Sequence, residues 1–359
     1  IGFTIASGII IYYFSITLPK YQTAQISNQS SKVISCAGAG LEFKVTNCNL
    51  DKGLVLWLPL DDVNSTNYTL DFSGYGNDGK LFNYPCNPAT CNLTSGVLGK
   101  ALSFDGVNDY VNAGNSSIFN SQAFSVVLWL NSAIIDSSYD TAIHKGLDYD
   151  REWGILRYAS TNGGGITAYI YNSSNGQFEL RSIVPEVGRW YHGALTFDGQ
   201  TARLYINGTL MVSRIIIGNR KITAHNLTIG SMSDPTHFWN GTIDEVRIYN
   251  RALTEEEINQ LYYNELNNKF NISLQLVYPL GSIANSIGKD FTAIVFLKNG
   301  TIIQKDFSLD KELGLQNPIV NYNLTIDGYY PSYGFVDKIK ICSKACSLIC
   351  YEVNVNGEC

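Results

Sequence analysis

Carboxylate side chains are the residues here whose types and spacing could do chemistry. In the stretch DYDRE, Asp148, Asp150 and Glu152 alternate, so on a strand they would share one face. A retaining glycosidase needs two carboxyl groups about 5–5.5 Å apart, and such a face could supply them. The stretch follows Gly146 in an expected hairpin loop, however, so a solvated acidic tip is the favoured interpretation.

No other residue pattern supports catalysis. Asp244 and Glu245 are adjacent, so on a regular strand they would point to opposite faces. The hydrolase pattern Glu-x-Asp-x-x-Glu, the zinc pattern HExxH and the serine elbow Gly-x-Ser-x-Gly are missing from the sequence. The four histidines are scattered along the chain, at His144, His192, His225 and His237. The sequence therefore predicts that the protein is not an enzyme.

The composition favours an extracellular β protein. The chain has 359 residues, enough for two or three domains, with 16% charged residues and 23 tyrosines. Its net charge of −6 argues against a nucleic-acid partner. Repeated Asn-x-Ser/Thr motifs favour a glycosylated surface protein. The candidate N-glycosylation residues are Asn28, Asn64, Asn67, Asn92, Asn115, Asn172, Asn207, Asn226, Asn240, Asn271, Asn299 and Asn323.

The cysteines point to an oxidising compartment. There are 8 of them, an even number, and no Cys-x-x-Cys pattern, which favours disulfides over zinc. They are Cys36, Cys48, Cys86, Cys91, Cys342, Cys346, Cys350 and Cys359. Cys86 with Cys91 is the preferred local pair. Cys36 could pair with Cys48, or either could join the C-terminal group.

The pattern of apolar residues divides the chain into four ranges. Residues 1–34 are expected to form one long helix, and residues 35–52 a lead-in bounded by cysteines. Residues 53–266 consist of short strands broken by Gly, Asn and Asp, which predicts an antiparallel sandwich. Residues 267–359 form a second, smaller β domain joined by disulfides, to which the lead-in could add a first strand. The fold class is therefore mainly β.

Two local signals are specific enough to place elements. Thr254 with Glu257 three residues later forms a capping box, which predicts a helix whose apolar face includes Ile258 and Leu261. In RLYINGTL, Asn207 and Gly208 stand between two alternating runs, a pattern typical of a two-residue hairpin turn.

The sandwich range also carries a family resemblance. Its phrases LVLWLPLDD, DFSGYGNDGKL, GKALSFDGVNDYVNAG, RWYHGALTFDGQTARLYINGTL and TIDEVRIYNRALTEEEINQLY follow one another in this order. Together they resemble the laminin G-like, concanavalin A-like jelly-roll family over residues 53–266. The resemblance implies two curved antiparallel sheets, often with one calcium ion, and a glycan or protein surface on the concave side.

The resemblance also implies candidate site residues. For calcium these are Asp71, with the Gly-rich turn that follows it, and Asp244 on the last strand, since calcium prefers oxygen ligands. The alternative is that Asp71 only supplies hydrogen bonds to its turn and Asp244 only caps a strand end. Trp239, in the Pro/Asn/Gly-bounded stretch DPTHFWNG, is expected to be partly exposed and is the candidate for stacking on a glycan.

The first eighteen residues, IGFTIASGIIIYYFSITL, are uncharged. As a helix they would extend roughly 27 Å, close to the ~30 Å of a hydrocarbon core. A helix that is apolar on all sides could equally be buried among identical helices. The phrase GFTI and the proline at position 19 resemble mature type IV pilins, and the lack of an acidic residue near the start makes archaeal pilins the better match.

These observations lead to one functional hypothesis. The protein is expected to be the structural subunit of an extracellular, type IV pilus-like archaeal filament that carries a lectin-like adhesion domain. Its partners would be identical subunits through the N-terminal helix, surface glycans or cell-surface proteins, and the membrane before assembly, with calcium as a possible cofactor. The alternatives are a monomeric membrane-anchored glycan-binding protein and a secreted glycosidase.

Overall fold

The computed structural model describes residues 5–6, 9–10, 42–45, 52–84, 92–134, 139–158, 165–266, 269–278, 288–297, 302–311, 313, 316, 319–327, 336–344 and 350–354. In the range of the predicted N-terminal helix, the described residues form two short strands, β1 (Ile5–Ala6) and β2 (Ile9–Ile10), which pair antiparallel. A long helix over 1–34 is therefore not shown, and most of that range lies outside the described residues. Among the described residues, none of the helices is both long and apolar enough to cross a membrane.

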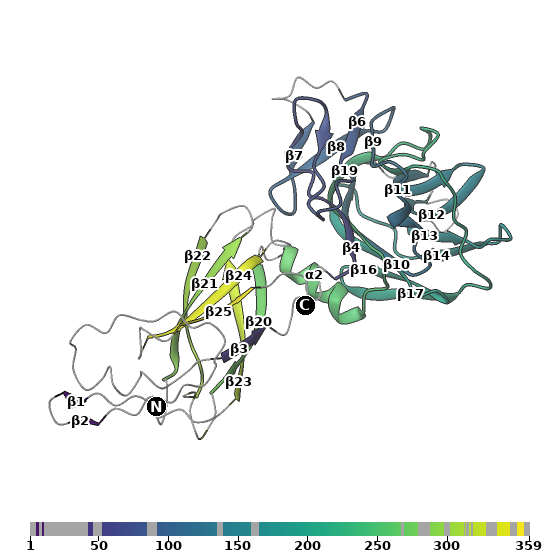
Figure 1. The fold of residues 1–359 in the computed structure, drawn as a ribbon. Helices are drawn as coiled ribbons and strands as arrows, with labels where there is room; N and C mark the ends of the chain where they lie inside the picture. Colours follow the sequence, from purple (N-terminus) through teal and green to yellow (C-terminus); the bar gives the residue numbers. More distant parts are fainter. Residues whose placement is uncertain are drawn as a thin grey trace.

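The central part of the chain forms two eight-stranded sheets (Figure 1). The first follows the order β17 (Thr209–Ile215), β16 (Thr201–Ile206), β15 (Trp190–Phe197), β10 (Phe124–Ser132), β19 (Asn240–Tyr249), β8 (Lys100–Asp105) and β7 (Leu93–Ser95). The eighth strand, β4 (Leu54–Leu58), pairs with the part of β19 that β8 leaves free.

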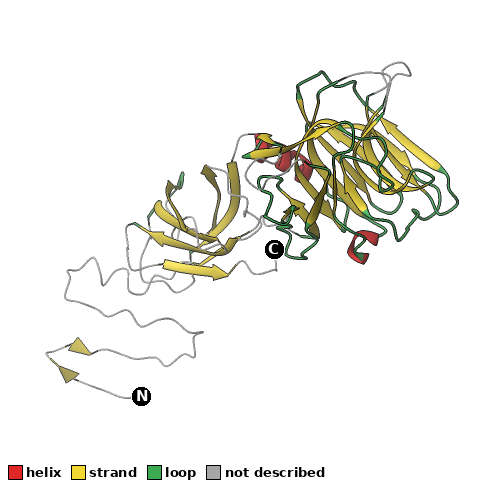
Figure 2. Cartoon of the chain, turned by 90° about the horizontal axis from the view of Figure 1, so that it is seen from above, coloured by secondary structure: helices red, strands yellow, loops and turns green. Residues whose placement is uncertain are grey.

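The second sheet lies against the first. Its order is β14 (Gln177–Arg181), β13 (Ile166–Tyr171), β12 (Asp150–Arg157), β11 (Asp140–Leu147), β18 (Leu227–Ile229), β9 (Tyr110–Asn112), β6 (Gly79–Phe82) and β5 (Tyr68–Thr69). A short 3₁₀ helix, η2 (Ser117–Asn120), precedes β10. The two sheets form the expected mainly β, jelly-roll-like sandwich (Figure 2).

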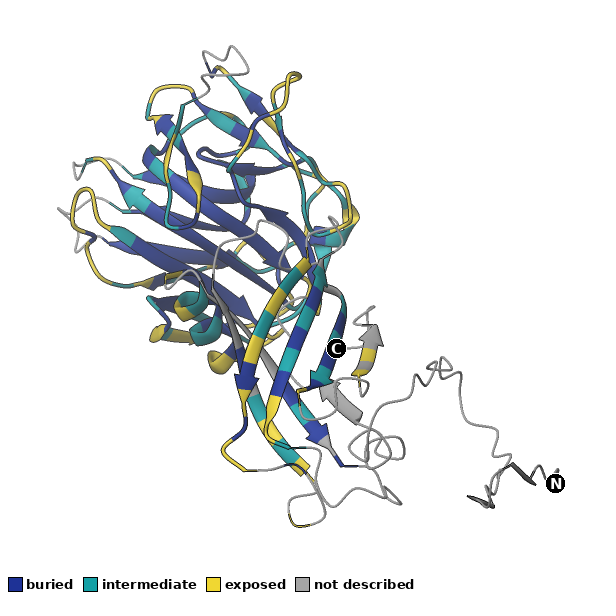
Figure 3. Cartoon of the chain, turned by 90° about the vertical axis from the view of Figure 1, so that its left-hand side faces the viewer, coloured by how far each residue is buried: buried dark blue, intermediate teal, exposed yellow. Residues whose placement is uncertain are grey.

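The main core fills the space between the sheets. Val126 and Leu128 of β10 belong to it together with Ile143 of β11 and Ile155 of β12. Figure 3 shows that the strands of the sandwich are mostly buried. The intervening residue Val127 points the other way and belongs to a second cluster on the outer face of the first sheet. Because both faces of β10 are covered, its sequence is a nearly continuous apolar run rather than an alternating one.

Helix α2 (Glu255–Leu266) covers the outer face of the first sheet. The Thr254 amide donates to Glu257 Oε2 at 2.8 Å, and the Glu257 amide donates to Thr254 Oγ1 at 3.3 Å, which confirms the predicted capping box. Ile258 and Leu261 are buried against the outer face of the first sheet. The predicted hairpin at Asn207 and Gly208 is also present, with φ of 51° and 78° between β16 and β17.

The C-terminal residues form two smaller sheets. One has the order β23 (Ile319–Asp327), β20 (Lys269–Val277) and β3 (Glu42–Val45). The other has the order β22 (Ile302–Ser308), β21 (Asp290–Leu297), β24 (Val336–Ser343) and β25 (Cys350–Asn354). Since β3 precedes the sandwich and β20 follows it, the sandwich is inserted between two neighbouring strands of one sheet (Figure 1).

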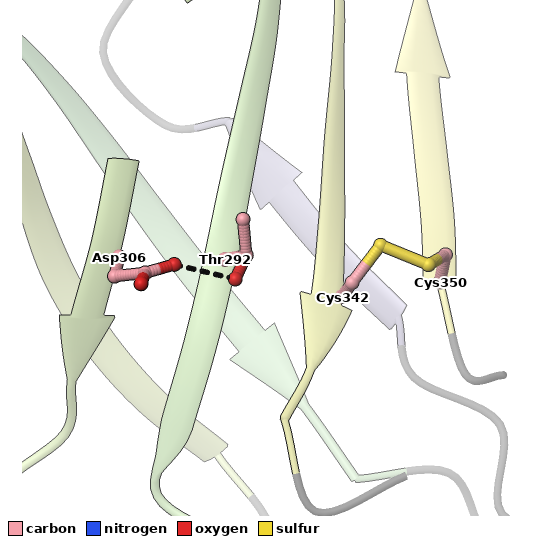
Figure 4. The surroundings of a disulfide bond; sticks show 4 residues. All are labelled: Thr292, Asp306, Cys342 and Cys350. Atoms are coloured by element: carbon pink, nitrogen blue, oxygen red, sulfur yellow. Dashed lines mark hydrogen bonds between the residues drawn. A yellow bond between two sulfur atoms is a disulfide. The ribbon is translucent and has the colours of Figure 1, made fainter. Parts of the chain in front are cut away.

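One disulfide joins the described cysteines. Cys342 of β24 and Cys350 of β25 are opposite each other in the ladder and are bonded through their sulfur atoms (Figure 4). On the same sheet, Thr292 of β21 donates a hydrogen bond to Asp306 of β22 at 2.6 Å. The other six cysteines lie outside the described residues, so their pairing stays a prediction.

Candidate functional site

The outer face of the second sheet carries polar and aromatic side chains in register. His144 of β11 is opposite Gly154 of β12, which is opposite Tyr169 of β13. The residues on either side of them along the strands, such as Ile143 and Ile155, belong to the inter-sheet core. His144, Gly154 and Tyr169 therefore point away from the core, because neighbouring residues of a strand face opposite ways.

The glycine in this row makes room for the tyrosine. A Cβ atom at Gly154 would lie 2.8 Å from the Tyr169 hydroxyl and 3.0 Å from the Ile143 carbonyl oxygen. The phenol ring can therefore lie over β12 and approach His144, with 5.9 Å between the ring centroids. A side chain at position 154 would displace the ring, so the sequence of β12 sets the position of a residue on β13.

The β11–β12 hairpin tip borders this row. Arg151 forms an ion pair with Asp148, and its guanidinium carbon lies 5.9 Å from the centre of the Tyr169 ring. The hydrogen bond from Arg151 lowers the pKa of Asp148, although partial burial opposes this shift. Asp234, from the loop between β18 and β19, accepts the Asp148 amide at 3.2 Å and thereby fixes the tip.

A second row lies nearer the ends of the strands. The rings of Tyr139, just before β11, and His237 have centroids 4.2 Å apart, and Tyr139 stacks on Tyr158 at 5.6 Å. The Arg181 guanidinium carbon lies 4.8 Å from the centre of the Tyr158 ring. His237 has a φ of 54°, a left-handed conformation that is uncommon for a residue other than glycine. Its carbonyl oxygen accepts the Thr141 amide at 2.9 Å, which anchors the loop to β11.

We call these seven residues the outer-face cluster: Tyr139, His144, Asp148, Arg151, Tyr158, Tyr169 and His237. The cluster has a buried floor, His144 and Tyr169, and a half-buried rim formed by the other five. The charges of Arg151, Asp148 and His237 all act on the His144 ring, so floor and rim form one electrostatic unit.

The floor contains polar atoms that lack partners within the described part of the chain. These are the Tyr169 hydroxyl and the Thr141 hydroxyl of β11. Burial, and secondly the charge of Arg151, lowers the pKa of His144 to about 3, while burial raises the pKa of Tyr169. Both side chains are therefore neutral near pH 7. Because an unsatisfied buried polar group costs about 1–3 kcal/mol, such a group calls for water, a ligand or a functional reason.

The acidic stretch DYDRE lies at a hairpin tip, as predicted, but it is not uniformly solvated. Glu152 is fully buried and pairs with Lys145 at 2.9 Å and Arg220 at 3.0 Å. Asp150 pairs with Lys221 at 2.5 Å. Glu152 therefore does not belong to a solvated acidic tip. It binds the segment after β17 to the rest of the sandwich.

Asp244 and Glu245 do not alternate as predicted. Ile243 and Val246 both belong to the inter-sheet core, so two residues rather than one lie between successive inward positions. The register shifts opposite Val127–Trp129, and Glu245 has a φ of 52°, which together define a β-bulge. Both carboxylates consequently lie on the same side of β19. Burial, and then the charge of Glu245, raises the pKa of Asp244.

The calcium prediction is only partly compatible with this geometry. Asp71 Oδ1 accepts the Trp57 and Ser73 amides at 2.9 Å, and Oδ2 accepts Ser73 Oγ at 2.8 Å and the Asn77 amide at 2.9 Å. Its roughly four acceptor positions are therefore used, and Asp71 does not fit a cation. Asp244 accepts two amides through Oδ2, whereas Oδ1 is buried without a partner within the described residues, so one oxygen remains.

Within the described part of the chain, Asp71 and Asp244 form no hydrogen bond to a common partner. Among the described residues, no three His, Cys, Asp or Glu side chains lie close enough to hold a metal ion together. Calcium therefore stays a prediction, restricted to Asp244.

Trp239 is not the exposed stacking residue that was expected. It is 1% exposed and belongs to the inter-sheet core, and its backbone amide donates to the Gly230 carbonyl oxygen at 2.8 Å. Among the candidate glycosylation residues, Asn64 and Asn67 are exposed, whereas the side-chain amide of Asn172 donates to the Ile217 carbonyl oxygen at 2.7 Å.

The sequence analysis missed the outer-face cluster. His144 and His237 are far apart in the sequence, and only the pairing of β11 with β12 and β18 brings them together. A usable signal was present, since His144 directly follows the apolar residues Ala142 and Ile143 of a strand.

Comparisons with known proteins agree with the sandwich architecture. Residues 105–259 match the family model Laminin_G_3, described as the concanavalin A-like lectin/glucanases superfamily. No curated protein matches the chain. Domain 4 of an extracellular family 43 arabinanase from Geobacillus stearothermophilus, solved with arabinotriose, is similar with 20% identity and a TM-score of 0.44, covering 58% of this chain and 98% of that one.

Two further solved structures are similar. A Trypanosoma rangeli sialidase in complex with sialic acid has 17% identity and a TM-score of 0.45, covering 59% of this chain. This chain spans 33% of the sialidase's length. The binding domain of botulinum neurotoxin serotype D has 17% identity and a TM-score of 0.45, covering 81% of this chain and 72% of that one.

These findings correct the prediction that an enzyme is excluded. The description of the matched family names glucanases as well as lectins. The missing sequence patterns therefore do not rule out an enzyme. Over residues 105–259 the chain is similar to laminin G-like, concanavalin A-like domains of the lectin type.

Proposed function

We propose that the laminin G-like domain binds carbohydrate through the outer-face cluster. The observation that carries the proposal is the half-buried rim, where the Asp148–Arg151 ion pair and the adjacent, tilted Tyr139 and His237 rings lie above floor atoms that have no hydrogen-bond partner among the described residues. Ligand sites characteristically combine aromatic surface with a few converging polar groups. A sugar presents both C–H surfaces and hydroxyl groups, so it matches this combination.

The charge of the rim supports a hydroxyl-rich ligand rather than an ion. Arg151 and Asp148 largely neutralise each other, and the floor residues His144 and Tyr169 are neutral. A carboxylate accepts hydrogen bonds from two hydroxyls, while a guanidinium donates to ring or hydroxyl oxygens. The pair can therefore bind neighbouring groups of one sugar without leaving a net charge buried.

The first test compares the full-length chain with two isosteric variants on a glycan array. Asp148→Asn removes the acceptor charge of the rim, and we expect at least about a tenfold loss of affinity, since a hydrogen bond to a charged group contributes roughly 1.5–3 kcal/mol. Asp198→Asn, in the hairpin between β15 and β16 of the other sheet, is the matched control and should bind normally. Glycan binding unchanged by Asp148→Asn, or no glycan bound at all, would contradict the proposal.

We further propose that the chain is an extracellular subunit of a pilus-like filament, with the sandwich as its projecting adhesion domain. The uncharged stretch at residues 1–18 supports this proposal, because it could be inserted in a membrane first and buried among identical helices later. The insertion of the sandwich between β3 and β20 is also compatible with a projecting domain. A membrane-anchored lectin is the competing proposal and would remain monomeric in detergent.

A further inference from the structure

The segment between β4 and β6 contains two Asn-x-Thr motifs in direct succession, NST at residues 64–66 and NYT at residues 67–69. Asn64 and Asn67 are both exposed, so exposure of the asparagine does not distinguish the motifs. The threonines do: Thr66 is exposed, whereas Thr69 belongs to β5 and is 2% exposed. Because modification of such a motif depends on the hydroxyl residue as well as on the asparagine, the fold separates two motifs that are equivalent in sequence.

The Asn64 side chain is fixed by its oxygen and leaves its nitrogen available. Its Oδ1 atom accepts the Thr66 amide at 2.9 Å, the Thr66 hydroxyl at 2.9 Å and the Tyr68 amide at 3.0 Å. Within the described part of the chain, Asn64 Nδ2 donates no hydrogen bond. The three donors would also stabilise negative charge on Oδ1 when Nδ2 loses a proton, because they already point at the atom where this charge develops.

The motif of Asn67, in contrast, is fixed in the second sheet. Thr69 is opposite Gly79 of β6, and a Cβ atom at Gly79 would lie 3.0 Å from the Thr69 methyl carbon. The Asn67 carbonyl oxygen accepts the Leu81 amide at 2.8 Å, which holds the start of this motif against β6 as well. An enzyme could therefore reach the Thr69 hydroxyl only after β5 had separated from β6.

Three other motifs are also engaged by the fold. In those of Asn115 and Asn172, Nδ2 donates to a backbone carbonyl oxygen, at 3.1 Å and 2.7 Å respectively. In that of Asn226, the hydroxyl residue Thr228 is 1% exposed and donates to a backbone carbonyl oxygen at 2.7 Å. The motif of Asn64 is a better acceptor than any of these, since neither its nitrogen nor its hydroxyl residue has to leave the folded structure.

From these contrasts we infer that Asn64 is an N-glycosylation site and that Asn67, in the folded protein, is not. In the reaction, Asn64 Nδ2 forms a bond to the anomeric carbon of a sugar carried on a lipid pyrophosphate. The bond from that carbon to the phosphate oxygen breaks, the lipid pyrophosphate leaves with the electron pair, and the Nδ2 proton passes to a base of the transferase. The inference rests on the proposed extracellular location, since such motifs are modified in secreted proteins. It does not involve the outer-face cluster.

The experiment offers the folded, unglycosylated full-length chain to a single-subunit oligosaccharyltransferase together with a lipid pyrophosphate-linked oligosaccharide. A synthetic peptide of residues 60–72 contains both motifs without the fold and is the reference. Peptide mass spectrometry measures the ratio of modified Asn64 to modified Asn67. We expect this ratio to be about tenfold or more higher in the folded chain than in the peptide, because local opening of a sheet is a minor population. Equal ratios, or a folded chain that is not modified by a transferase active on the peptide, would overturn the inference.

Variants of the full-length chain test the assignment within the same loop. Asn64→Gln and Thr66→Val should each remove the glycan from this loop, whereas Thr66→Ser, which keeps the hydroxyl, should retain it. Asn67→Gln is the matched control and should be modified like the parent chain, and circular dichroism checks that all four are folded. Protein from the cells that produce it should carry a glycan at Asn64, and its absence there would overturn the inference. Binding of the same preparations to the glycan array tests the proposed carbohydrate site separately.

Discussion

Asp109 is a carboxylate removed almost completely from water. It is 1% exposed, and its Oδ2 accepts the Asp105 amide at 3.1 Å. Burial, and secondly the charge of Asp105, raises its pKa to about 6. The folded protein therefore binds a proton at Asp109 more tightly than the unfolded chain, in which the pKa of an aspartate is about 3.9.

This shift predicts a specific pH dependence of stability. The unfavourable charge of Asp109 is absent below about pH 4 and fully present above about pH 6, so the free energy of unfolding falls between these values. Asp109→Asn should raise it at pH 7.5 by about 1–3 kcal/mol and change it little at pH 4. Urea unfolding at the two pH values measures the difference.

Asp105 offers a control of opposite sign. Burial raises its pKa, but the amides of Val107, Asn108 and Asp109 lower it more, so the net shift is downward. Asp105 therefore stabilises the fold at neutral pH and loses this effect as the pH falls. Asp105→Asn should be destabilising at pH 7.5, and equal effects of both variants at both pH values would contradict this account.

Single residues were predictable from the sequence only where their role is local. Asn207 with Gly208 forms the predicted turn because two positive φ angles are needed there and both residues tolerate them. Trp239 was placed wrongly, because its surroundings in sequence are polar while its ring lies between two sheets made of distant residues. His144 and His237 were missed for the same reason.

At the scale of elements, helix α2 holds a buried polar network against the first sheet. Trp129 Nε1 donates to Glu265 at 2.5 Å, and Trp57 Nε1 donates to Glu245 at 2.8 Å. Arg247 forms ion pairs with both Glu245 and Glu265. The helix therefore satisfies carboxylates and indoles that would otherwise be buried without partners.

The capping box at the start of α2 gives an element-scale prediction. Thr254→Ala removes the hydroxyl that accepts the Glu257 amide, and we expect a loss of about 1 kcal/mol in the free energy of unfolding. Thr254→Ser keeps the hydroxyl and should lose much less. Chemical denaturation of the three proteins decides the point, and a serine variant as unstable as the alanine variant would show that the hydroxyl is not responsible.

Elements with a strong local signal were predictable, and those shaped by pairing were not. Helix α2 and the β16–β17 hairpin follow from short patterns. The bulge at Glu245 has no local signature, since the residue is a glutamate in an otherwise regular strand sequence. The candidate site could not be predicted from the sequence, because it depends on the register in which β11, β12 and β13 pair.

For the whole molecule, the N-terminal stretch carries the filament proposal. Burying an Ile-sized side chain contributes roughly 1.5–3 kcal/mol, so the run that includes Ile9, Ile10 and Ile11 could hold a subunit firmly among its neighbours. A carboxylate placed there would be dry and unpaired, at a cost well above that of a surface ion pair.

We therefore expect Ile10→Asp, or deletion of residues 1–18, to leave the β domains folded and to stop assembly. Negative-stain electron microscopy and sedimentation report the assembly, and circular dichroism reports the fold. Ile302→Asp, which alters an exposed apolar residue of β22, is the matched control and should assemble normally. Filaments of normal length from the truncated chain would leave the membrane-anchored lectin as the better proposal.

The pairing of β3 with β20 also has a consequence for the order of folding. Bringing Val45 beside Leu274 closes a loop that contains the entire sandwich, and loop closure costs about 0.6 kcal/mol for each doubling of length. Once the sandwich has folded, its ends are tied together, because the Asn250 amide donates to the Gly53 carbonyl oxygen at 2.8 Å. The flexible part of the loop is then roughly eightfold shorter, which reduces the entropic cost by about 2 kcal/mol. The inserted domain is thus expected to form first and to act as the template on which the flanking sheet closes.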